Sequence, residues 1–164
     1  MNEKPSAEEV ARWQRRLASQ ANNRAWVLSE QTSRSEREDE ELLHAAHAAM
    51  YFWSIVGDAS NQAHAAQLLA HTYAILKQPS AAAQYLERCL PTFMDESAQP
   101  WERALAQAVA ANVASANGQA EDHARHYNQA IKLTAALEDA EERAIIEATL
   151  RVVPAPSGSS ASAA

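Results

Sequence analysis

Residues 41–47 hold the side chains with the clearest capacity for metal chemistry. Glu41, His44 and His47 follow one another at steps of three. On a helix this spacing lets one carboxylate and two imidazoles point the same way, and Glu-x-x-His is the arrangement with which helical bundles hold iron or zinc. Further ligands would have to come from another helix, and the histidines available are His71, His123 and His126. The alternative interpretation makes His44 and His47 hydrogen-bonded packing residues at the junction of two helix pairs.

A second polar set, His64, Gln67 and His71, has steps of three and four. On a helix these three side chains share one face. Amides and imidazoles can hydrogen-bond to the backbone of an extended peptide or of a helix laid against them. The set therefore indicates either a surface that binds a polypeptide or an ordinary polar surface without a ligand.

Both sets depend on helices, and six helices are predicted. The composition is 47% hydrophobic with only three glycines and no long runs of alternating Val, Ile or Thr, which favours an all-α fold. Ser6 with Glu9 and Ser35 with Glu38 form capping boxes that open the first two helices. Gly57 ends the second helix, and Pro91 loosens or ends the fourth. The predicted helices cover residues 6–30, 35–56, 58–76 (or from 60), 79–90, 97–117 and 120–151, with a possible bend or break at 138–142.

Small residues recur in the middle of the chain, in residues 69–90, LAHTYAILKQPSAAAQYLERCL. Ala70 stands on the first of two predicted helices, and Ala82 and Cys89 surround the bulkier Leu86 on the second. Small residues at such positions let neighbouring helices approach closely. The later residues Ala111, Gly118, Tyr127 and Ala130 repeat the spacing of Ala70, Lys77, Leu86 and Cys89. This pattern of paired helices resembles a tetratricopeptide repeat.

The resemblance extends to a narrower group. The run EDEELLHAAHAAMYFW at residues 38–53, followed by Gly57 and the paired helices, is similar to small bacterial tetratricopeptide-like proteins of no assigned activity. It implies a right-handed, tetratricopeptide-like array of three antiparallel helix pairs and no enzyme chemistry. We expect one helical-repeat domain over residues 1–153. Residues 154–164, PAPSGSSASAA, lack apolar side chains large enough to order them and are expected to form a disordered tail.

The resemblance also implies a concave groove lined by the first helix of each pair. When the groove positions of the repeat are assigned to this sequence by spacing, His64, Gln67 and His71 fall on the groove side of one helix. The matching residues of the next first helix are Leu105, Ala108, Asn112 and Ser115.

Charge and cysteine content exclude several classes of function. The net charge of −7 repels a phosphate backbone or an anionic membrane, so we expect neither nucleic acid nor a membrane as partner. The polar N-terminus is unlike a signal peptide, and a cytoplasmic protein is expected. Cys89 is the only cysteine and falls where the repeat requires a small buried residue, so a structural thiol is predicted. No nucleophile turn or phosphate-binding loop is present.

The function expected from these observations is non-enzymatic binding of a protein or peptide in the concave groove, without a cofactor. The alternative is a metal- or cofactor-binding helical bundle centred on Glu41, His44 and His47. A third hypothesis is a homo-oligomerisation module, in which exposed tryptophans such as Trp13, Trp26 or Trp101 form the interface.

Overall fold

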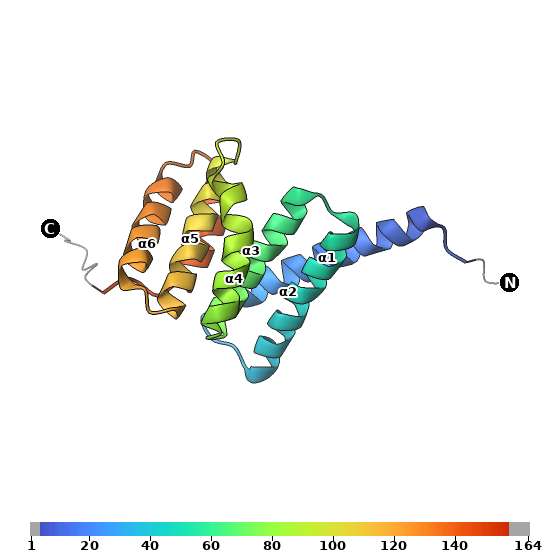
Figure 1. Ribbon diagram of the computed structural model, residues 1–164, viewed down its shortest axis with the longest axis horizontal. Coiled ribbons are helices and arrows are strands. Elements are labelled where there is room, and N and C mark those ends of the chain that lie inside the picture. Colours follow the sequence, from blue (N-terminus) through green and yellow to red (C-terminus); the bar gives the residue numbers. More distant parts are fainter. Residues whose placement is uncertain (1–3, 158–164) are drawn as a thin grey trace.

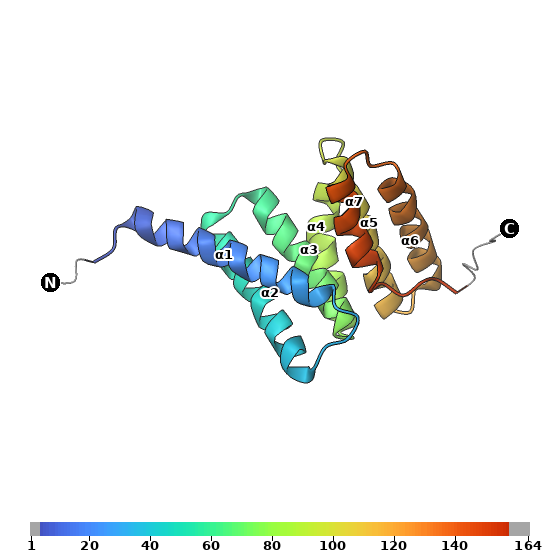
Figure 2. The same ribbon diagram turned by 180° about the vertical axis from the view of Figure 1, so that it is seen from behind.

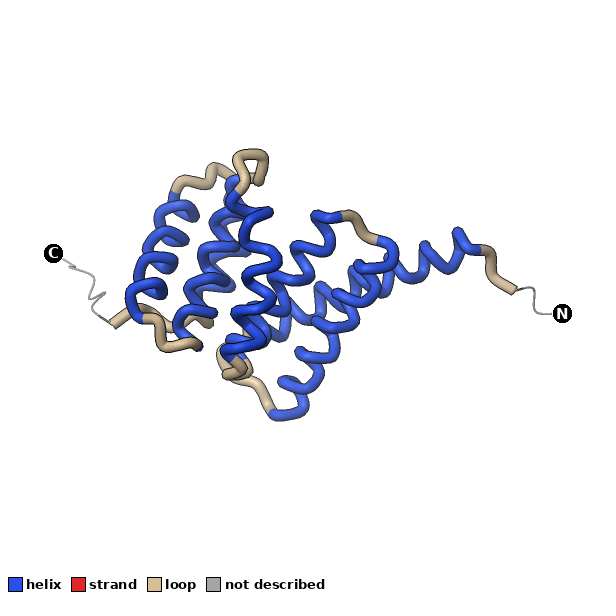
Figure 3. Tube along the Cα trace, in the orientation of Figure 1, coloured by secondary structure: helices blue, strands red, loops and turns tan. Residues whose placement is uncertain are grey.

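The computed structural model describes residues 4–157, and within this part of the chain every regular element is an α-helix (Figures 1 and 3). The prediction of an all-α fold is therefore confirmed. The helices are α1 (Ala7–Ser29), α2 (Glu36–Val56), α3 (Ala59–Ile75), α4 (Pro79–Met94), α5 (Pro100–Ala116), α6 (Ala120–Ala135) and α7 (Ala140–Leu150). None of them combines the length and the apolar character needed to cross a membrane.

The helix starts follow from local chemistry. The hydroxyl of Ser6 accepts a hydrogen bond from the backbone N–H of Glu9, whose carboxylate accepts one from the N–H of Ser6. Ser35 and Glu38 form the same reciprocal pair at α2. Each pair satisfies N–H groups that have no partner inside the helix. Both predicted capping boxes are confirmed.

Gly57 ends α2 and is needed for a steric reason. A Cβ at this position would lie 2.6 Å from the carbonyl oxygen of Trp53, 2.8 Å from the Cβ of Asn61 and 3.0 Å from Cε3 of the Trp53 ring. Backbone cannot move aside as a flexible side chain can, so a larger residue here would displace α3 or the Trp53 indole. The missing side chain at Gly57 thus leaves room for Trp53 and for the start of α3.

The possible break predicted near residues 138–142 of the sixth helix is present, whereas the predicted end of the fourth helix is wrong. The sixth predicted helix, residues 120–151, is divided into α6 and α7, because the Asp139 carboxylate accepts hydrogen bonds from the N–H groups of Glu141 and Glu142 and starts a new helix. The fourth helix passes through Pro91 and ends at Met94. Pro91 cannot donate to the carbonyl of Glu87, but both residues are exposed, so water can reach that carbonyl.

The helices pack as consecutive pairs, α1 with α2, α3 with α4, and α5 with α6. The first helix of each pair also packs on the next first helix, in the order α1, α3, α5, and α7 then continues this series beside α5. Figure 2 shows α1 and α7 in front, on the same side of the molecule. We call this side, formed by α1, α3, α5 and α7, the inner face.

The second and third pairs repeat each other with a displacement of 41 residues. Lys77 and Gly118 both follow a first helix with positive φ, 58° and 71°. In each repeat the next residue donates its N–H back into the helix, from Gln78 to the Tyr73 carbonyl and from Gln119 to the Ala114 carbonyl, both at 2.9 Å. The small residues Ala70, Ala111, Cys89 and Ala130 are all buried. The predicted correspondence of these positions is confirmed.

The C-terminal boundary lies later than predicted. A ring nitrogen of His123, Nε2, lies 2.8 Å from the carbonyl oxygen of Pro154, and Pro156 is buried. Residues 154–157 therefore pack on α6 and do not belong to a disordered tail. The remainder of the predicted tail, residues 158–164, lies outside the described residues.

Candidate functional site

The residues of the predicted metal motif are engaged elsewhere. The Glu41 carboxylate accepts two hydrogen bonds from the guanidinium of Arg24 on α1, at 2.6 Å and 3.0 Å. This ion pair lowers the pKa of Glu41, because the carboxylate is stabilised in its charged form. His44 is exposed to solvent.

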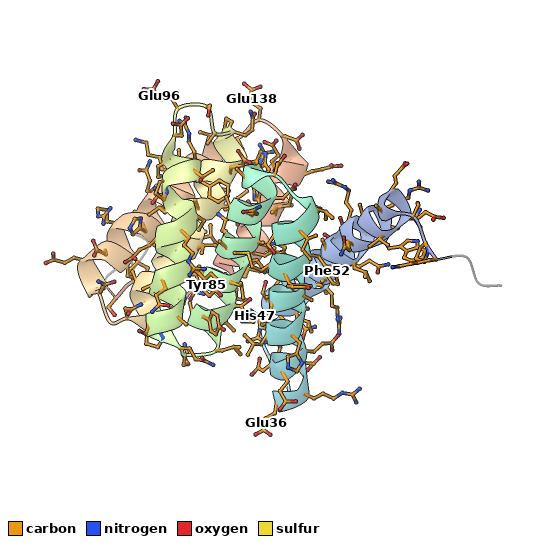
Figure 4. The ribbon with its side chains drawn as sticks, turned by 45° about the vertical axis from the view of Figure 1, so that its right-hand side comes forward. Glu36, His47, Phe52, Tyr85, Glu96 and Glu138 are labelled. Atoms are coloured by element: carbon orange, nitrogen blue, oxygen red, sulfur yellow. The ribbon has the colours of Figure 1, made fainter. Side chains whose placement is uncertain are left out.

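His47 is a packing residue. Its Nε2 lies 2.6 Å from the hydroxyl oxygen of Tyr73, and its ring meets Tyr85 edge to face, with 6.3 Å between centroids. Figure 4 shows His47 on α2 facing Tyr85 on α4. Burial, together with the charge of His44, lowers the pKa of His47 and favours the neutral ring.

His47 thus joins the first helix pair to the second, as the packing interpretation predicted for it, whereas the same prediction for His44 is wrong because His44 is exposed. Across residues 4–157 no group of three or more His, Cys, Asp or Glu side chains is placed to hold a metal ion. The metal-centred alternative has no geometric support in this part of the chain.

Four residues predicted to line the groove are buried instead. Exposed fractions are 1% for Gln67, 0% for His71, 0% for Ala108 and 4% for Asn112. The face of α3 that bears Gln67 and His71 is pressed against the equivalent face of α5, so these side chains meet each other and not solvent. Ser115, further along α5, is half-buried.

His71 is the centre of this buried polar layer. The side-chain amide of Asn112 approaches Nδ1 of His71 at 3.1 Å, and the indole of Trp26 stacks on the imidazole with 5.7 Å between centroids. Burial, with a smaller contribution from the charge of Arg34, lowers the pKa of His71 to about 3. The ring is therefore neutral. Its Nε2 and both amide atoms of Gln67 have no hydrogen-bond partner among the described residues.

The remaining predicted groove residues, His64 and Leu105, reach an open hollow on the inner face. It has a volume of about 410 Å³ and takes side chains from five helices. We call it the tryptophan pocket. Its lining residues are Asn22, Trp26, Glu30, Trp53, Asn61, His64, Trp101, Leu105 and Ile145.

Two indoles of the tryptophan pocket are held by ring stacking. Trp101 lies parallel to the His64 imidazole, 9° between planes and 5.7 Å between centroids. His64 is fixed in turn by Glu102, whose Oε1 lies 2.9 Å from Nε2. Trp26 stacks on His71. Trp26 and Trp101 are therefore preorganised.

Sequence reasoning missed the tryptophans as a set. It treated Trp26 and Trp101 as core residues or as an oligomer interface, because aromatic residues at helical spacing usually pack inside. The sequence contained one signal for the pocket: Trp26 and Trp101 lie on the first helices of their pairs. Trp101 also lies one turn before Leu105, which was predicted to line the groove. Trp53 comes from α2 and could be found only through the packing of α2 on α3.

Glu30 supplies the carboxylate of the tryptophan pocket. It forms the C-cap of α1, where the helix dipole disfavours negative charge. Burial raises its pKa, and the charge of Arg151 opposes that shift. Within residues 4–157 no hydrogen-bond donor contributes to the pKa of Glu30.

A second hollow of about 250 Å³ lies at the other end of the inner face, where α1, α3 and α7 end. Its cations are Arg34, Lys77 and Arg151. Arg34 donates to the Gln31 carbonyl at 2.8 Å and to the Asp39 carboxylate at 2.7 Å. This guanidinium neutralises the end of α1, as expected for a cation near free helix carbonyls.

The single thiol is not a nucleophile. Cys89 is 1% exposed, and burial raises its pKa to about 12. The predicted structural role of Cys89 is confirmed.

Comparison with known proteins yields no relative. Protein-family models, curated proteins and solved structures contain no match to this chain.

Proposed function

We propose that this chain is a non-enzymatic binding module, a tetratricopeptide-like right-handed array of three helix pairs that holds a protein or peptide on its inner face. It works without a cofactor and acts in the cytoplasm. The observation that carries the proposal is the tryptophan pocket, an open hollow to which five helices contribute.

The packing order supports the tetratricopeptide-like arrangement. First helices contact first helices along the molecule, and each second helix packs against its own pair and the next first helix. Such an order leaves one face made of first helices alone, which is where repeat proteins bind extended ligands. The fixed indoles support binding, because preorganised aromatic side chains lose little conformational entropy when a ligand arrives.

Selection from a random peptide library displayed on phage, with the purified protein as bait, tests the proposal. Ile145 on α7 and Ile131 on α6 make a matched pair, because they are 47% and 46% exposed and only Ile145 lines the tryptophan pocket. We expect the wild-type chain to enrich peptides that also bind Ile131→Lys. Ile145→Lys should weaken their binding by about tenfold or more, because it puts a charge into an apolar contact.

Circular dichroism confirms that both variants are folded before binding is compared. If no peptide is enriched over beads without protein, the proposal is wrong. It is also wrong if enriched peptides bind Ile145→Lys as tightly as Ile131→Lys, because the binding surface then lies away from the inner face.

A further inference from the structure

The tryptophan pocket combines aromatic rings with one carboxylate. Trp26, Trp53 and Trp101 line the same hollow, and Glu30 lines it as well. The face of an indole ring attracts a cation through its quadrupole, more strongly than the rings of tyrosine or phenylalanine. A carboxylate beside such rings supplies the countercharge.

The negative charge of Glu30 does not stabilise α1. A negative side chain at a helix C-terminus opposes the helix dipole, and the last turn of α1 contains no basic residue. The nearby cation Arg151 is exposed and lines the second hollow, and within the described residues it forms no ion pair with Glu30. The carboxylate is thus partly desolvated without a bonded partner.

The other carboxylate beside the pocket is already used. Glu102 contacts His64 through one oxygen and accepts a hydrogen bond from the backbone N–H of Gln99 at 2.9 Å through the other. Glu30 is therefore the acidic group of this hollow whose hydrogen-bonding capacity is open to a ligand.

We propose that the tryptophan pocket receives the side chain of an arginine in the bound peptide, with the guanidinium stacked on the indoles and paired with the carboxylate of Glu30. This inference rests on the proposed function and adds the chemistry of the recognised residue. The net charge of −7 agrees with it, because it attracts basic peptides over long range.

Arginine fits this pocket better than lysine for two reasons. Its guanidinium is planar and weakly hydrated, so it can leave water and stack on an indole at low cost. It also offers two parallel N–H donors to one carboxylate, whereas the ammonium of lysine is a compact and strongly hydrated point charge.

The test uses the four tryptophans as reporters. Trp13 is the fourth, 51% exposed and outside the tryptophan pocket, and it serves as an internal control. The indole N–H signals are followed by ¹H–¹⁵N NMR in the full chain, with Trp13→Phe used to identify the control signal. The ligand is the capped tripeptide Ac-Gly-Arg-Gly-NH2, compared with the same peptide containing citrulline, the neutral isostere of arginine, and with its lysine form.

We expect the arginine peptide to shift the signals of Trp26, Trp53 and Trp101 and to leave Trp13 in place. The citrulline peptide and the Glu30→Gln variant should each weaken binding by about tenfold or more, since each removes one charge of the pair. The lysine peptide should bind more weakly than the arginine peptide. Glu138→Gln is the matched control, an exposed carboxylate in the α6–α7 connection, labelled in Figure 4, that should leave binding unchanged.

The inference is overturned by equal binding of the citrulline and arginine peptides, by unchanged binding in Glu30→Gln, by no shift at millimolar peptide, or by a shift of Trp13 equal to the others. These outcomes are distinguishable from failure of the proposed function. If library peptides still bind and lose affinity in Ile145→Lys, the inner face binds peptides by another chemistry. If they do not, both proposals fall together.

Discussion

At the scale of single residues, the most unusual group is His71. An imidazole with 0% exposure, stacked on Trp26 and approached by the Asn112 amide, is stable inside the protein only in its neutral form. His71 and Asn112 occupy equivalent positions of the two repeats, 41 residues apart. Their contact ties α3 to α5 directly beneath the tryptophan pocket.

The buried histidine makes stability depend on pH. The pKa of His71 is lowered from 6.5 to about 3 in the folded chain, so below about pH 6 the unfolded state binds a proton that the folded state does not. Stability is therefore fully present above the unfolded pKa and is lost as the pH falls. We expect the free energy of unfolding in urea to drop by about 1 kcal/mol per pH unit from His71 between about pH 6 and pH 4.

A comparison of variants isolates this contribution. In His71→Asn the slope should be flatter than in the wild type by that amount. His47 and His126 also have lowered pKa values and contribute equally to both chains. Parallel slopes for wild type and His71→Asn would show that His71 is protonated in the folded protein.

At the scale of helices, the link inside the second pair and the link inside the third pair each depend on one residue with positive φ. Gly118 adopts this conformation without cost, but Lys77 has a Cβ that crowds its own backbone. The hydrogen bonds around the two positions are the same. The chain thus contains one link in a relaxed form and one in a strained form.

Exchanging the residue types should change stability in opposite directions. Lys77→Gly should raise the free energy of unfolding by about 0.5–1 kcal/mol, because relief of strain exceeds the added entropy of the unfolded glycine. Gly118→Ala should lower it by about 1 kcal/mol. An added Cβ at Gly118 meets no atom within 4 Å, so that loss would measure the backbone alone. Thermal and urea unfolding give both values, and a less stable Lys77→Gly would contradict the explanation.

Local sequence signals predicted the helices well where a cap is formed by neighbours in the chain. Ser6 with Glu9, Ser35 with Glu38, and Gly57 specify their ends through atoms a few residues away. The break before α7 was located only as a possible bend, because the apolar pattern continues across it and the cap of Asp139 competes with a continuous helix.

The candidate site was harder to predict because it depends on which face of a helix meets which neighbour. His64, Gln67 and His71 do share a face, but helices α1, α2, α4 and α5 all pack on α3 and leave only the His64 end open. Spacing along one helix cannot reveal how many neighbours surround it. The tryptophan pocket is formed by side chains from five helices, so no local sequence pattern predicts it.

At the scale of the whole molecule, the two ends of the array are closed differently. The last pair is covered by α7, and the chain after α7 contacts the first turn of α6 through His123 and Pro154. The buried Pro156 and the contact between His123 and Pro154 hold this segment in place.

Truncation after Val153 tests the importance of this closure. The loss of the Pro154 carbonyl leaves Nε2 of His123, a residue 8% exposed, without its partner, and the loss of Pro156 uncovers apolar surface. We expect the free energy of unfolding to fall by about 1–2 kcal/mol relative to the full chain. The predicted disordered tail from residue 154 implies no loss, so an unchanged unfolding midpoint would support that earlier boundary.

The opposite end of the array, where α1 begins, is not covered by another helix of residues 4–157, and this affects how fast that end opens. The first half of α1 projects from the body in Figure 1, and the buried residues of α1 begin only at Ala18. Arg15 donates to the Val56 carbonyl at 2.8 Å, while Trp13 and Leu17 are about half exposed. A helical segment of this length that buries no residue is marginal in water. Its amide hydrogens should therefore exchange with deuterium long before those of α3, and trypsin should cleave after Arg12 before it reaches the body. The first half of α1 should therefore unfold and refold many times while the rest of the protein stays folded. Each of these local openings leaves the tryptophan pocket intact.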